Sequence, residues 1–429
     1  MSSANSATAT TDDDIEIRPI GEDEIAAWGA AVNLGFLRPQ DPDGEEYRRL
    51  RYHPGRMQAA FDRGRVVGTM RSFPFKLALP GGALLPVSAV SGVTVQSTHR
   101  RRGLLSRMMA NDLAAALERG EPAAVLIAAE YPIYGRFGFG PAARSHGVRI
   151  DLRVAGGLRA DLPADLRSPA GGRLELIDLT ELAKIGPGLH ERWLPGRPGA
   201  VTRDDAYWQT LTGQVIQPGA EFKRPFAVVH RDAADTVTGL AVYRVDDQWD
   251  GMLPNCTLTV RDFMALDRAT AVTLWRYLAS VDWVTRLEVP RLGVDDPLPL
   301  LLANPRAALP HEDTGDFLWL RLLDLPAVCA ARQFAGPGRV VLEIDDPAGY
   351  LAGRWALSAD TTGTGAATPT TDAPDLALTA GALGTLFLGG ESAGRLAAAG
   401  LLEERRPGAA FALDRLLATP QRPFNGDMF

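Results

Sequence analysis

One stretch in the first third of the chain restricts the folds that this sequence can adopt. Residues 90–95 alternate in the manner of a β-strand and lead into a turn rich in arginine and glycine. The apolar spacing that follows predicts a helix over residues 103–118, and residues 125–129 form a short apolar run typical of a buried strand. Strand, helix and strand in this order make a βαβ unit, so we predict a mixed sheet covered by helices.

The remaining elements predict three domains, which suits 429 residues at roughly 150 residues per domain. Residues 15–155 contain the βαβ unit. Residues 156–295 repeat its order of strands and helices in a weaker form, without the arginine-rich turn, and residues 296–429 have an α+β order. Residues 1–14 are rich in Ser, Ala and Thr, so we expect a disordered tail.

Some finer predictions depend on single turn signals. We expect separate strands at residues 65–74, 76–79 and 84–87, because proline and glycine interrupt the pattern. A strand at residues 317–322 is grouped with the third domain, and residues 360–373, rich in Thr, Gly and Ala, are expected to form a flexible tip.

Composition and charge exclude several classes of protein. A formal charge of −7 argues against a dedicated nucleic-acid binder, and the apolar runs are far shorter than the ~20 residues that cross a bilayer. The N-terminus lacks the basic and apolar regions of a signal peptide, so we expect a cytoplasmic protein. Cys256 and Cys329 lie far apart without CxxC spacing, and we therefore expect neither a disulfide framework nor a metal site.

The turn between strand and helix is a candidate anion site. Arg100, Arg101, Arg102 and Gly103 directly precede the predicted helix. A helix start offers unpaired N–H groups and the positive end of the dipole, and glycine lets a bulky phosphate approach the backbone. From these residues alone, the alternative is a solvated turn of three arginines. His99, just before them, is interpreted as a turn residue rather than a base.

Two motifs together make the chain resemble a known family. The segment 93–109 is similar to the acyl-CoA-binding element of the GCN5-related N-acetyltransferases (GNATs), although Leu105 stands where Gly or Ala is usual. Residues 133–141 read Ile-Tyr-Gly-Arg-Phe-Gly-Phe-Gly-Pro. With both motifs at this spacing, nearly the whole chain resembles the Eis (enhanced intracellular survival) family.

The resemblance implies a mixed α/β, or α+β, fold class with two tandem GNAT domains and a sterol-carrier-protein-like C-terminal domain. It assigns residues 15–155 to the catalytic GNAT domain, residues 156–295 to a degenerate GNAT-like domain and residues 296–429 to the sterol-carrier-like domain. It also implies a homohexamer that acts on small-molecule amines, with neither nucleic acid nor membrane as a partner.

The implied activity is acetyl-CoA-dependent N-acetylation of primary amines, such as aminoglycosides, polyamine-like cations or lysine side chains. Direct attack in a ternary complex is favoured over a covalent intermediate, because neither cysteine lies near the motifs. By resemblance, the pantetheine arm and the pyrophosphate of the donor would be bound by Val93, Thr94, Val95, Arg100, Arg101, Arg102, Gly103, Leu104 and Leu105.

The resemblance also assigns two catalytic groups. Tyr134 would be the general acid, since a phenol with a reference pKa of about 10 is protonated at pH 7 and can protonate the leaving thiolate. The α-carboxylate of the last residue, Phe429, would be the general base, because it is ionised at pH 7 and attracts an ammonium group. The plainer alternatives are a core aromatic at 134, with Tyr131 as local competitor, and a terminal ring that only packs.

Trp28, Phe36 and Glu130 are candidate residues of the substrate pocket, each with packing or solvation as the simpler interpretation. A different class of function also stays open at this stage. In that alternative the chain is a non-enzymatic protein that binds an apolar ligand in its sterol-carrier-like domain, or binds CoA as a sensor.

Overall fold

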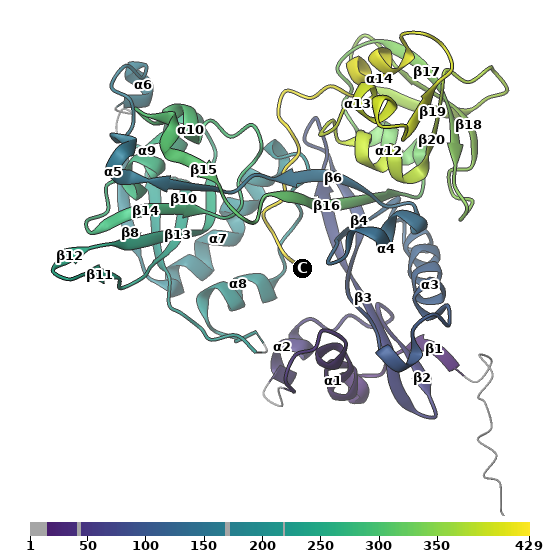
Figure 1. Cartoon of the computed structure of the whole chain (residues 1–429), viewed down its shortest axis with the longest axis horizontal. Coiled ribbons are helices and arrows are strands. Elements are labelled where there is room, and N and C mark those ends of the chain that lie inside the picture. The colour runs from purple at the N-terminus through teal and green to yellow at the C-terminus, as the bar shows by residue number, and fades with distance from the viewer. Residues whose placement is uncertain (1–14, 41–43, 168–171, 218) are drawn as a thin grey trace, which may run out of the picture.

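The computed structural model describes residues 15–40, 44–167, 172–217 and 219–429, so the tail predicted for residues 1–14 lies outside the described residues. Two seven-stranded sheets and one five-stranded sheet organise the described part of the chain into three units (Figure 1). Helices cover the faces of these sheets, and the predicted mixed α/β fold class is confirmed.

The first sheet has the order β1-β2-β3-β4-β5-β16-β6, and β4 and β5 are its parallel pair. Its strands are β1 (Ile15–Pro19), β2 (Met57–Asp62), β3 (Arg65–Ala78), β4 (Leu84–Val95), β5 (Ala123–Ile127), β6 (Gly140–Ser145) and β16 (Gly315–Leu322). The crossover between β4 and β5 is α3 (Leu104–Glu118), as the sequence predicted. Met108 and Met109 of α3 pack on one face of the sheet, and Trp28 of α1 (Ile25–Gly35) packs on the other, near α2 (Glu45–Leu50).

The break predicted at residue 75 and the end predicted at residue 87 are wrong, whereas the turn between residues 79 and 84 is confirmed. β3 and β4 are two long strands that pair with one irregularity, between Thr69 and Arg71, and Pro74 lies opposite Ser88. Pro74 does not end β3, because β2 pairs with β3 only as far as Arg71. At Pro74 itself, no second strand in the described ranges requires the N–H that proline lacks.

The second sheet has the order β15-β7-β14-β13-β10-β9-β8, and it exchanges strands with the first (Figure 1). Its main strands are β7 (Val148–Asp151), β8 (Arg173–Ile177), β9 (Phe226–Arg231), β10 (Val237–Val245), β13 (Cys256–Ala265), β14 (Val284–Val289) and β15 (Ala308–Pro310). β6 of the first sheet continues into β7 of the second, and β15 of the second continues into β16 of the first.

The prediction that residues 317–322 belong with the third domain is therefore wrong, since an apolar strand does not itself specify its partners. The boundaries at residues 155 and 295 stay predictions, and strand pairing crosses both.

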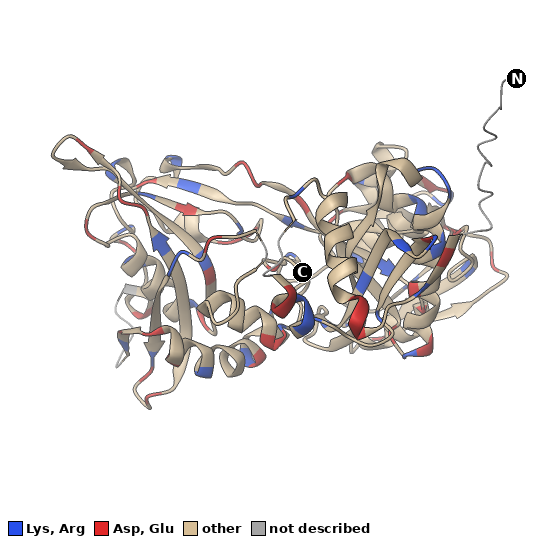
Figure 2. Ribbon diagram, turned by 90° about the horizontal axis from the view of Figure 1, so that it is seen from below, with Lys and Arg blue, Asp and Glu red and all other residues tan. Residues whose placement is uncertain are grey.

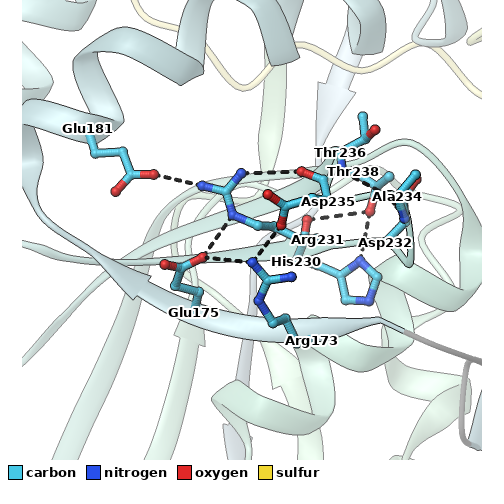
Figure 3. A network of polar contacts seen from close by, with 10 residues as sticks. All are labelled: Arg173, Glu175, Glu181, His230, Arg231, Asp232, Ala234, Asp235, Thr236 and Thr238. Carbon is cyan, nitrogen blue, oxygen red and sulfur yellow. Dashed lines mark hydrogen bonds and ion pairs between the residues drawn. The ribbon is translucent and has the colours of Figure 1, made fainter.

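The second unit has three longer helices, α7 (Leu179–Trp193), α8 (Asp205–Thr212) and α9 (Arg268–Leu278). Its short helices are α5 (Leu152–Ala155), α6 (Ala164–Arg167) and α10 (Leu298–Leu301). Its outer strands carry the ion-pair network of Figure 3, in which Arg231 of β9 contacts Glu175 of β8 at 2.8 Å and Glu181 of α7 at 2.7 Å. Ion pairs this close to solvent contribute ~0–1 kcal/mol each, but their charges discourage edge-to-edge association of sheets.

The third unit is a five-stranded sheet in the order β19-β18-β17-β20-β21. Its elements are α11 (Leu325–Ala331), β17 (Gly338–Asp345), β18 (Gly353–Ala359), β19 (Gly365–Pro369), β20 (Leu376–Thr379), α12 (Ala380–Phe387), α13 (Ala393–Ala398), β21 (Leu402–Glu404) and α14 (Ala409–Leu417). The flexible tip predicted at residues 360–373 is wrong, because β19 lies within it and pairs with β18 over five residues. Small residues give little strand signal, yet Gly365 and Ala367 of β19 are buried.

One hydrophobic core joins the first sheet to the third unit. Phe73 and Phe75 of β3 and Leu320 of β16 belong to the same buried cluster as Leu342 of β17 and Leu383 of α12. Side chains therefore fill the space between the third sheet and its helices. No helix in the described ranges is long and apolar enough to cross a membrane.

The C-terminal segment connects all three units. After α14, Phe424 donates a backbone hydrogen bond of 2.8 Å to Pro198 of the second unit. The chain then ends between the second unit and the first sheet, where the C-terminus is marked in both views (Figure 1, Figure 2). The last residue is thus held far from the body of its own domain.

Candidate active site

β4 leaves β5 at the centre of the first sheet. The two strands pair from Val87 to Val90, and β4 then forms a bulge at Gly92, whose φ is +60°. The Thr69 hydroxyl donates a 2.8 Å hydrogen bond to the Gly92 carbonyl and lies 2.7 Å from the Thr94 hydroxyl. The Thr94 hydroxyl therefore has a hydrogen-bond partner within the sheet, and its side chain is buried. Among the described strands, none pairs with Val93–Val95 on the β5 side, so a ligand can bind this backbone as an added strand would.

The predicted anion site is an open helix start. Gly103 has a φ of +71° and is the N-cap of α3, with no side-chain cap, and a Cβ added there would meet nothing within 4 Å. Arg100 and Arg101 are exposed and Arg102 is half-buried. None of the three guanidinium groups makes a hydrogen bond or ion pair with another residue that the structure describes. These groups and the free N–H groups of the first turn fit a diphosphate.

Leu104, Leu105 and His99 contribute less directly to this turn. The Leu104 side chain is buried against Ala60 and Val67, so its backbone is what remains for a ligand, and Leu105 is half-buried. His99 is buried, with Nε2 3.1 Å from Asp62 Oδ2, and this hydrogen bond lowers the pKa of Asp62. The histidine therefore fixes the turn from inside, as expected of a turn residue.

The equivalent helix start in the second unit is capped by a side chain. α9 follows β13 as α3 follows β4, but the N-cap of α9 is Asp267. The Asp267 carboxylate accepts hydrogen bonds of 2.8 Å from the Thr270 backbone N–H and from the Thr270 hydroxyl. A carboxylate at this position occupies the amides and repels a phosphate. Of these two helix starts, that of α3 is the one that suits an anion.

Tyr134 lies where β4 and β5 separate. It ends the short helix α4 (Tyr131–Tyr134), is 7% exposed, and packs with Val90 and Leu126, the last paired residues of the two strands. Its hydroxyl makes no hydrogen bond with the residues placed in the structure. Burial raises the pKa of Tyr134, and the nearby charge of Glu130 raises it further. The phenol therefore stays protonated at neutral pH.

The competitor Tyr131 is 62% exposed and packs edge-on against Trp319, with ring centroids 4.9 Å apart.

The turn after Tyr134 is held from the opposite side. Gly138 has a φ of +79°, and a Cβ there would lie 2.6 Å from Nη1 of Arg321. Arg321 is fully buried and forms two 2.7 Å hydrogen bonds with Asp346 of the third unit. The third unit thus fixes the segment that carries Tyr134.

The terminal residue reaches this same region. The Ser91 hydroxyl of β4 donates a 2.8 Å hydrogen bond to the terminal oxygen of Phe429, and the Phe429 ring packs edge-on against Phe75 at 5.7 Å. The ring and the carboxylate therefore both have defined partners. The two interpretations of Phe429, as a packing residue and as a source of a carboxylate, are compatible in this geometry.

Arg203 of the second unit holds the C-terminal segment two residues before its end. Its guanidinium contacts Asp427 at 2.9 Å and Asp262 of β13 at 2.8 Å, and all three side chains are at most 10% exposed. Burial raises the pKa of Asp427, and Arg203 opposes this rise. Asn425 is buried as well and donates to the Asp427 carbonyl at 2.8 Å. Sequence reasoning missed Ser91, Arg203 and Asp427, because no local pattern marks partners so distant along the chain.

The structure places the three candidate pocket residues differently. Trp28 is 2% exposed, donates from Nε1 to the Gln58 carbonyl at 3.1 Å, and has its ring edge against Gly92. Phe36 is 38% exposed at the end of α1, beneath the Arg38 guanidinium. Glu130 is exposed and precedes α4. Trp28 therefore reaches the β4 bulge, whereas Glu130 acts on the site through its charge near Tyr134.

Within the described ranges, no cluster of three or more His, Cys, Asp or Glu side chains is placed to hold a metal ion. Both cysteines are free and buried, and burial raises the pKa of Cys329 to about 12. Neither is among the residues that pack around Tyr134.

Comparisons with known proteins agree with this geometry. Family models described as acetyltransferase (GNAT) domains match residues 16–142 and 199–322, and a sterol carrier protein domain matches residues 325–426. An uncharacterized N-acetyltransferase of Streptomyces griseus is 46% identical over 97% of this chain and all of its own length. N-acetyltransferase Eis of Mycobacterium bovis is 36% identical over 81% of this chain and 84% of its own. The crystal structure of Eis1 from Mycobacterium abscessus superposes with a TM-score of 0.84 at 30% identity, over 96% of this chain and all of that one.

Proposed function

The chain belongs to the Eis family of GNAT N-acetyltransferases, and we propose that it transfers the acetyl group of acetyl-CoA directly to a primary amine. The observation that carries this proposal is the hydrogen bond from Ser91 to the Phe429 carboxylate. It holds an anionic base on β4, beside the point where that strand leaves β5 and where Tyr134 packs.

Donor binding is assigned to the free edge of β4 and the start of α3. The backbone of Val93–Val95 would pair with the amide groups of the pantetheine arm, and the N–H groups from Gly103 onward would hold the diphosphate with the arginines. The open space at Gly103 and the unpartnered guanidinium groups support this assignment. The thioester would then lie between β4 and β5, near the phenol.

The chemistry uses one base and one acid. The Phe429 carboxylate attracts the ammonium group of the acceptor and takes its proton, and the amine nitrogen then attacks the thioester carbonyl carbon. A C–N bond forms, the C–S bond breaks, and the departing thiolate takes the proton of the Tyr134 hydroxyl. The second proton lost by the amine nitrogen returns the Tyr134 phenolate to its phenol form, so the products are the neutral amide and the CoA thiol. The raised pKa of Tyr134 supports this role, because the phenol is available in its protonated form.

The resemblance supplies the acceptors to test: aminoglycosides, polyamine-like cations and lysine side chains. We further propose the homohexamer and the cytoplasmic location implied by the family resemblance and the sequence. The division into a catalytic domain, a degenerate GNAT-like domain and a sterol-carrier-like domain is likewise a proposal about roles. The Asp267 cap at the start of α9 supports the proposal that the second GNAT-like domain is degenerate.

Thiol release from acetyl-CoA tests the proposed activity, with one amine of each class present and the acetylated amine identified by mass spectrometry. The rate should fall about 100-fold or more in Tyr134→Phe, since general acid catalysis contributes about 10²–10⁴-fold. Tyr131→Phe is the matched control and should keep most of the activity, because Tyr131 is largely exposed. A wild-type rate no higher than that of Tyr134→Phe with every amine would refute the proposal.

A further inference from the structure

Two arginines lie on the side of the first sheet where the acceptor amine would be bound. Arg71 of β3 and Arg51, which directly follows α2, place their guanidinium carbons 4.6 Å and 4.3 Å from the centre of the Phe73 ring. Arg71 also lies 5.6 Å from the ring centre of Trp28. Arg51 is buried and Arg71 is half-buried, so neither is an ordinary surface arginine.

Strand register puts Arg71 beside the proposed catalytic base. Arg71 is the cross-strand partner of Ser91, which holds the Phe429 carboxylate. Residues directly opposite one another in an antiparallel pair share a face of the sheet. A Cβ at Gly92, in the bulge, would lie 3.6 Å from Cγ of Arg71. The neighbouring residue Ser72 faces the other way, toward Asp112 of α3.

The two arginines on this face differ in their partners. Arg51 contacts the Tyr47 hydroxyl at 2.8 Å and Asp204 at 3.4 Å. Arg71 shares the Tyr47 hydroxyl and is attracted by Asp204, but it makes no ion pair with any carboxylate that the structure describes, and its buried Nε has no partner. Burial lowers the pKa of Arg71 to about 10, with the Arg51 charge adding to the effect.

The other titratable groups around Phe73 that the structure describes do not form an ion pair with Arg71. His53 packs edge-on against the ring, and burial lowers its pKa. Asp204 is paired with Arg51, and the Phe429 carboxylate, held by the neutral Ser91 hydroxyl, is a second negative charge near this face. By contrast, Arg203 lies between two carboxylates. A desolvated guanidinium without an anion is costly, which favours an anionic ligand at Arg71.

We propose that Arg71, with Arg51 beside it, binds a carboxylate of the acceptor, so that the acceptor is a primary amine that also carries a carboxylate. The planar guanidinium can bind a carboxylate through two parallel hydrogen bonds. The ammonium group of such a zwitterion then points to Phe429 and its carboxylate to Arg71. A purely cationic amine would leave Arg71 without an anionic partner. This inference rests on the proposed function and narrows its acceptor class.

Equilibrium binding to the full-length protein in the presence of CoA tests the inference without requiring turnover. The probes are ε-aminocaproate and its uncharged amide, which differ in the carboxylate alone. Calorimetry should show the carboxylate form bound about 10- to 100-fold more tightly, as expected for charge-assisted hydrogen bonds. Arg71→Gln should bring the ratio close to one, Arg71→Lys should give an intermediate ratio, and Arg65→Gln, on an exposed position of the same strand, should leave the ratio unchanged.

Equal affinity of the wild-type protein for the two probes overturns the inference, whether or not the variants fold. It is also overturned if Arg71→Gln lowers turnover of both amines equally and shifts the pH profile, because Arg71 would then serve the Phe429 carboxylate. Preferential, Arg71-dependent binding of ε-aminocaproate without acetyl transfer to any amine would refute the proposed function, and with it the ligand's role as acetyl acceptor, while leaving Arg71 as a carboxylate-binding residue.

Discussion

The Ser91 hydroxyl donates a 2.8 Å hydrogen bond to the terminal oxygen of Phe429, a residue 338 positions further along the chain. This contact brings the end of the third unit to the central strand of the first. A terminal carboxylate is ordinarily solvated and mobile. Here a hydroxyl, an aromatic contact with Phe75 and the Arg203–Asp427 pair limit where it can lie.

Ser91→Ala should lower kcat for amine acetylation by about 10-fold or more. A hydrogen bond to a charged group contributes about 1.5–3 kcal/mol, and each 1.36 kcal/mol is a factor of ten in rate. KM for acetyl-CoA should change little, since Ser91 precedes the proposed donor-binding segment. Steady-state kinetics measure both constants. Ser280→Ala, on an exposed turn, is the control. Unchanged kcat would show that the carboxylate does not need Ser91.

Gly103→Asp should weaken CoA binding about 10-fold relative to Gly103→Ala. Both variants bear the cost of a side chain at a φ of +71°, about 1 kcal/mol, so their difference reports the added carboxylate at the helix start. The reverse change in the second unit, Asp267→Gly, should leave CoA affinity unaltered. Calorimetric titration with CoA measures all three. A tighter affinity in Asp267→Gly, with Gly103→Asp no weaker than Gly103→Ala, would place the donor at α9 and contradict the assignment.

Local sequence patterns were sufficient to predict the unit that carries the candidate active site. The turn of Arg100–Gly103 and the helix after it follow from residues adjacent in the chain, and β4, α3 and β5 appear in the predicted order. The family, the fold class and the N-acetyltransferase activity class predicted from the two motifs are confirmed. The roles of Tyr134, Phe429 and the donor-binding residues stay predictions.

The local patterns did not predict strand pairing or contacts between residues far apart in the chain. β7 alternates apolar and charged residues and β16 is largely apolar, and neither pattern specifies a sheet. The exchange of strands is decided by pairing between distant residues. Arg203 likewise finds Asp427 through the fold, because nothing beside either residue marks the other. The strand pattern around Arg71 does not indicate that this side chain lies on the face of the sheet where the acceptor is proposed to bind. Sequence therefore predicts the elements of the site more readily than the contacts that position its last residue.

Asp427→Asn should reduce kcat about 10-fold while KM for acetyl-CoA stays nearly constant. Arg203 would keep Asp262 as its partner, so the loss of stability should be about 1–3 kcal/mol, the cost of one charge-assisted hydrogen bond. The C-terminal segment would be held less firmly, and the carboxylate would occupy its position for less of the time.

The control for Asp427→Asn is Asp414→Asn. Asp414 accepts a 3.0 Å hydrogen bond from Ser392 within the third unit, and neither residue belongs to the group of contacts around the C-terminal residue. Its loss should lower the melting temperature without changing kcat per folded molecule. If the two variants lost activity only in proportion to stability, Asp427 would have no positioning role.

Asp296→Asn should stabilise the protein at neutral pH and have little effect near pH 4. Burial raises the pKa of Asp296 from 3.8 to about 6, while a backbone hydrogen bond from Leu298 and the charge of Arg197 offset part of the rise. Between these two pH values the folded state binds a proton that the unfolded state has lost. Stability therefore falls as pH rises through this window and is constant above it.

The side-chain amide introduced by Asp296→Asn would not ionise, and its oxygen can still accept the 2.8 Å hydrogen bond from the Leu298 N–H. At 1.36 kcal/mol per pKa unit, and allowing for partial solvent access and the lost attraction to Arg197, the gain at pH 7 should be about 1–2 kcal/mol. Melting temperatures of the wild type and variant between pH 4 and pH 7 measure it. Asp282→Asn, at an exposed position, should show no such pH-dependent difference. A constant difference across this range would mean that Asp296 does not titrate within it.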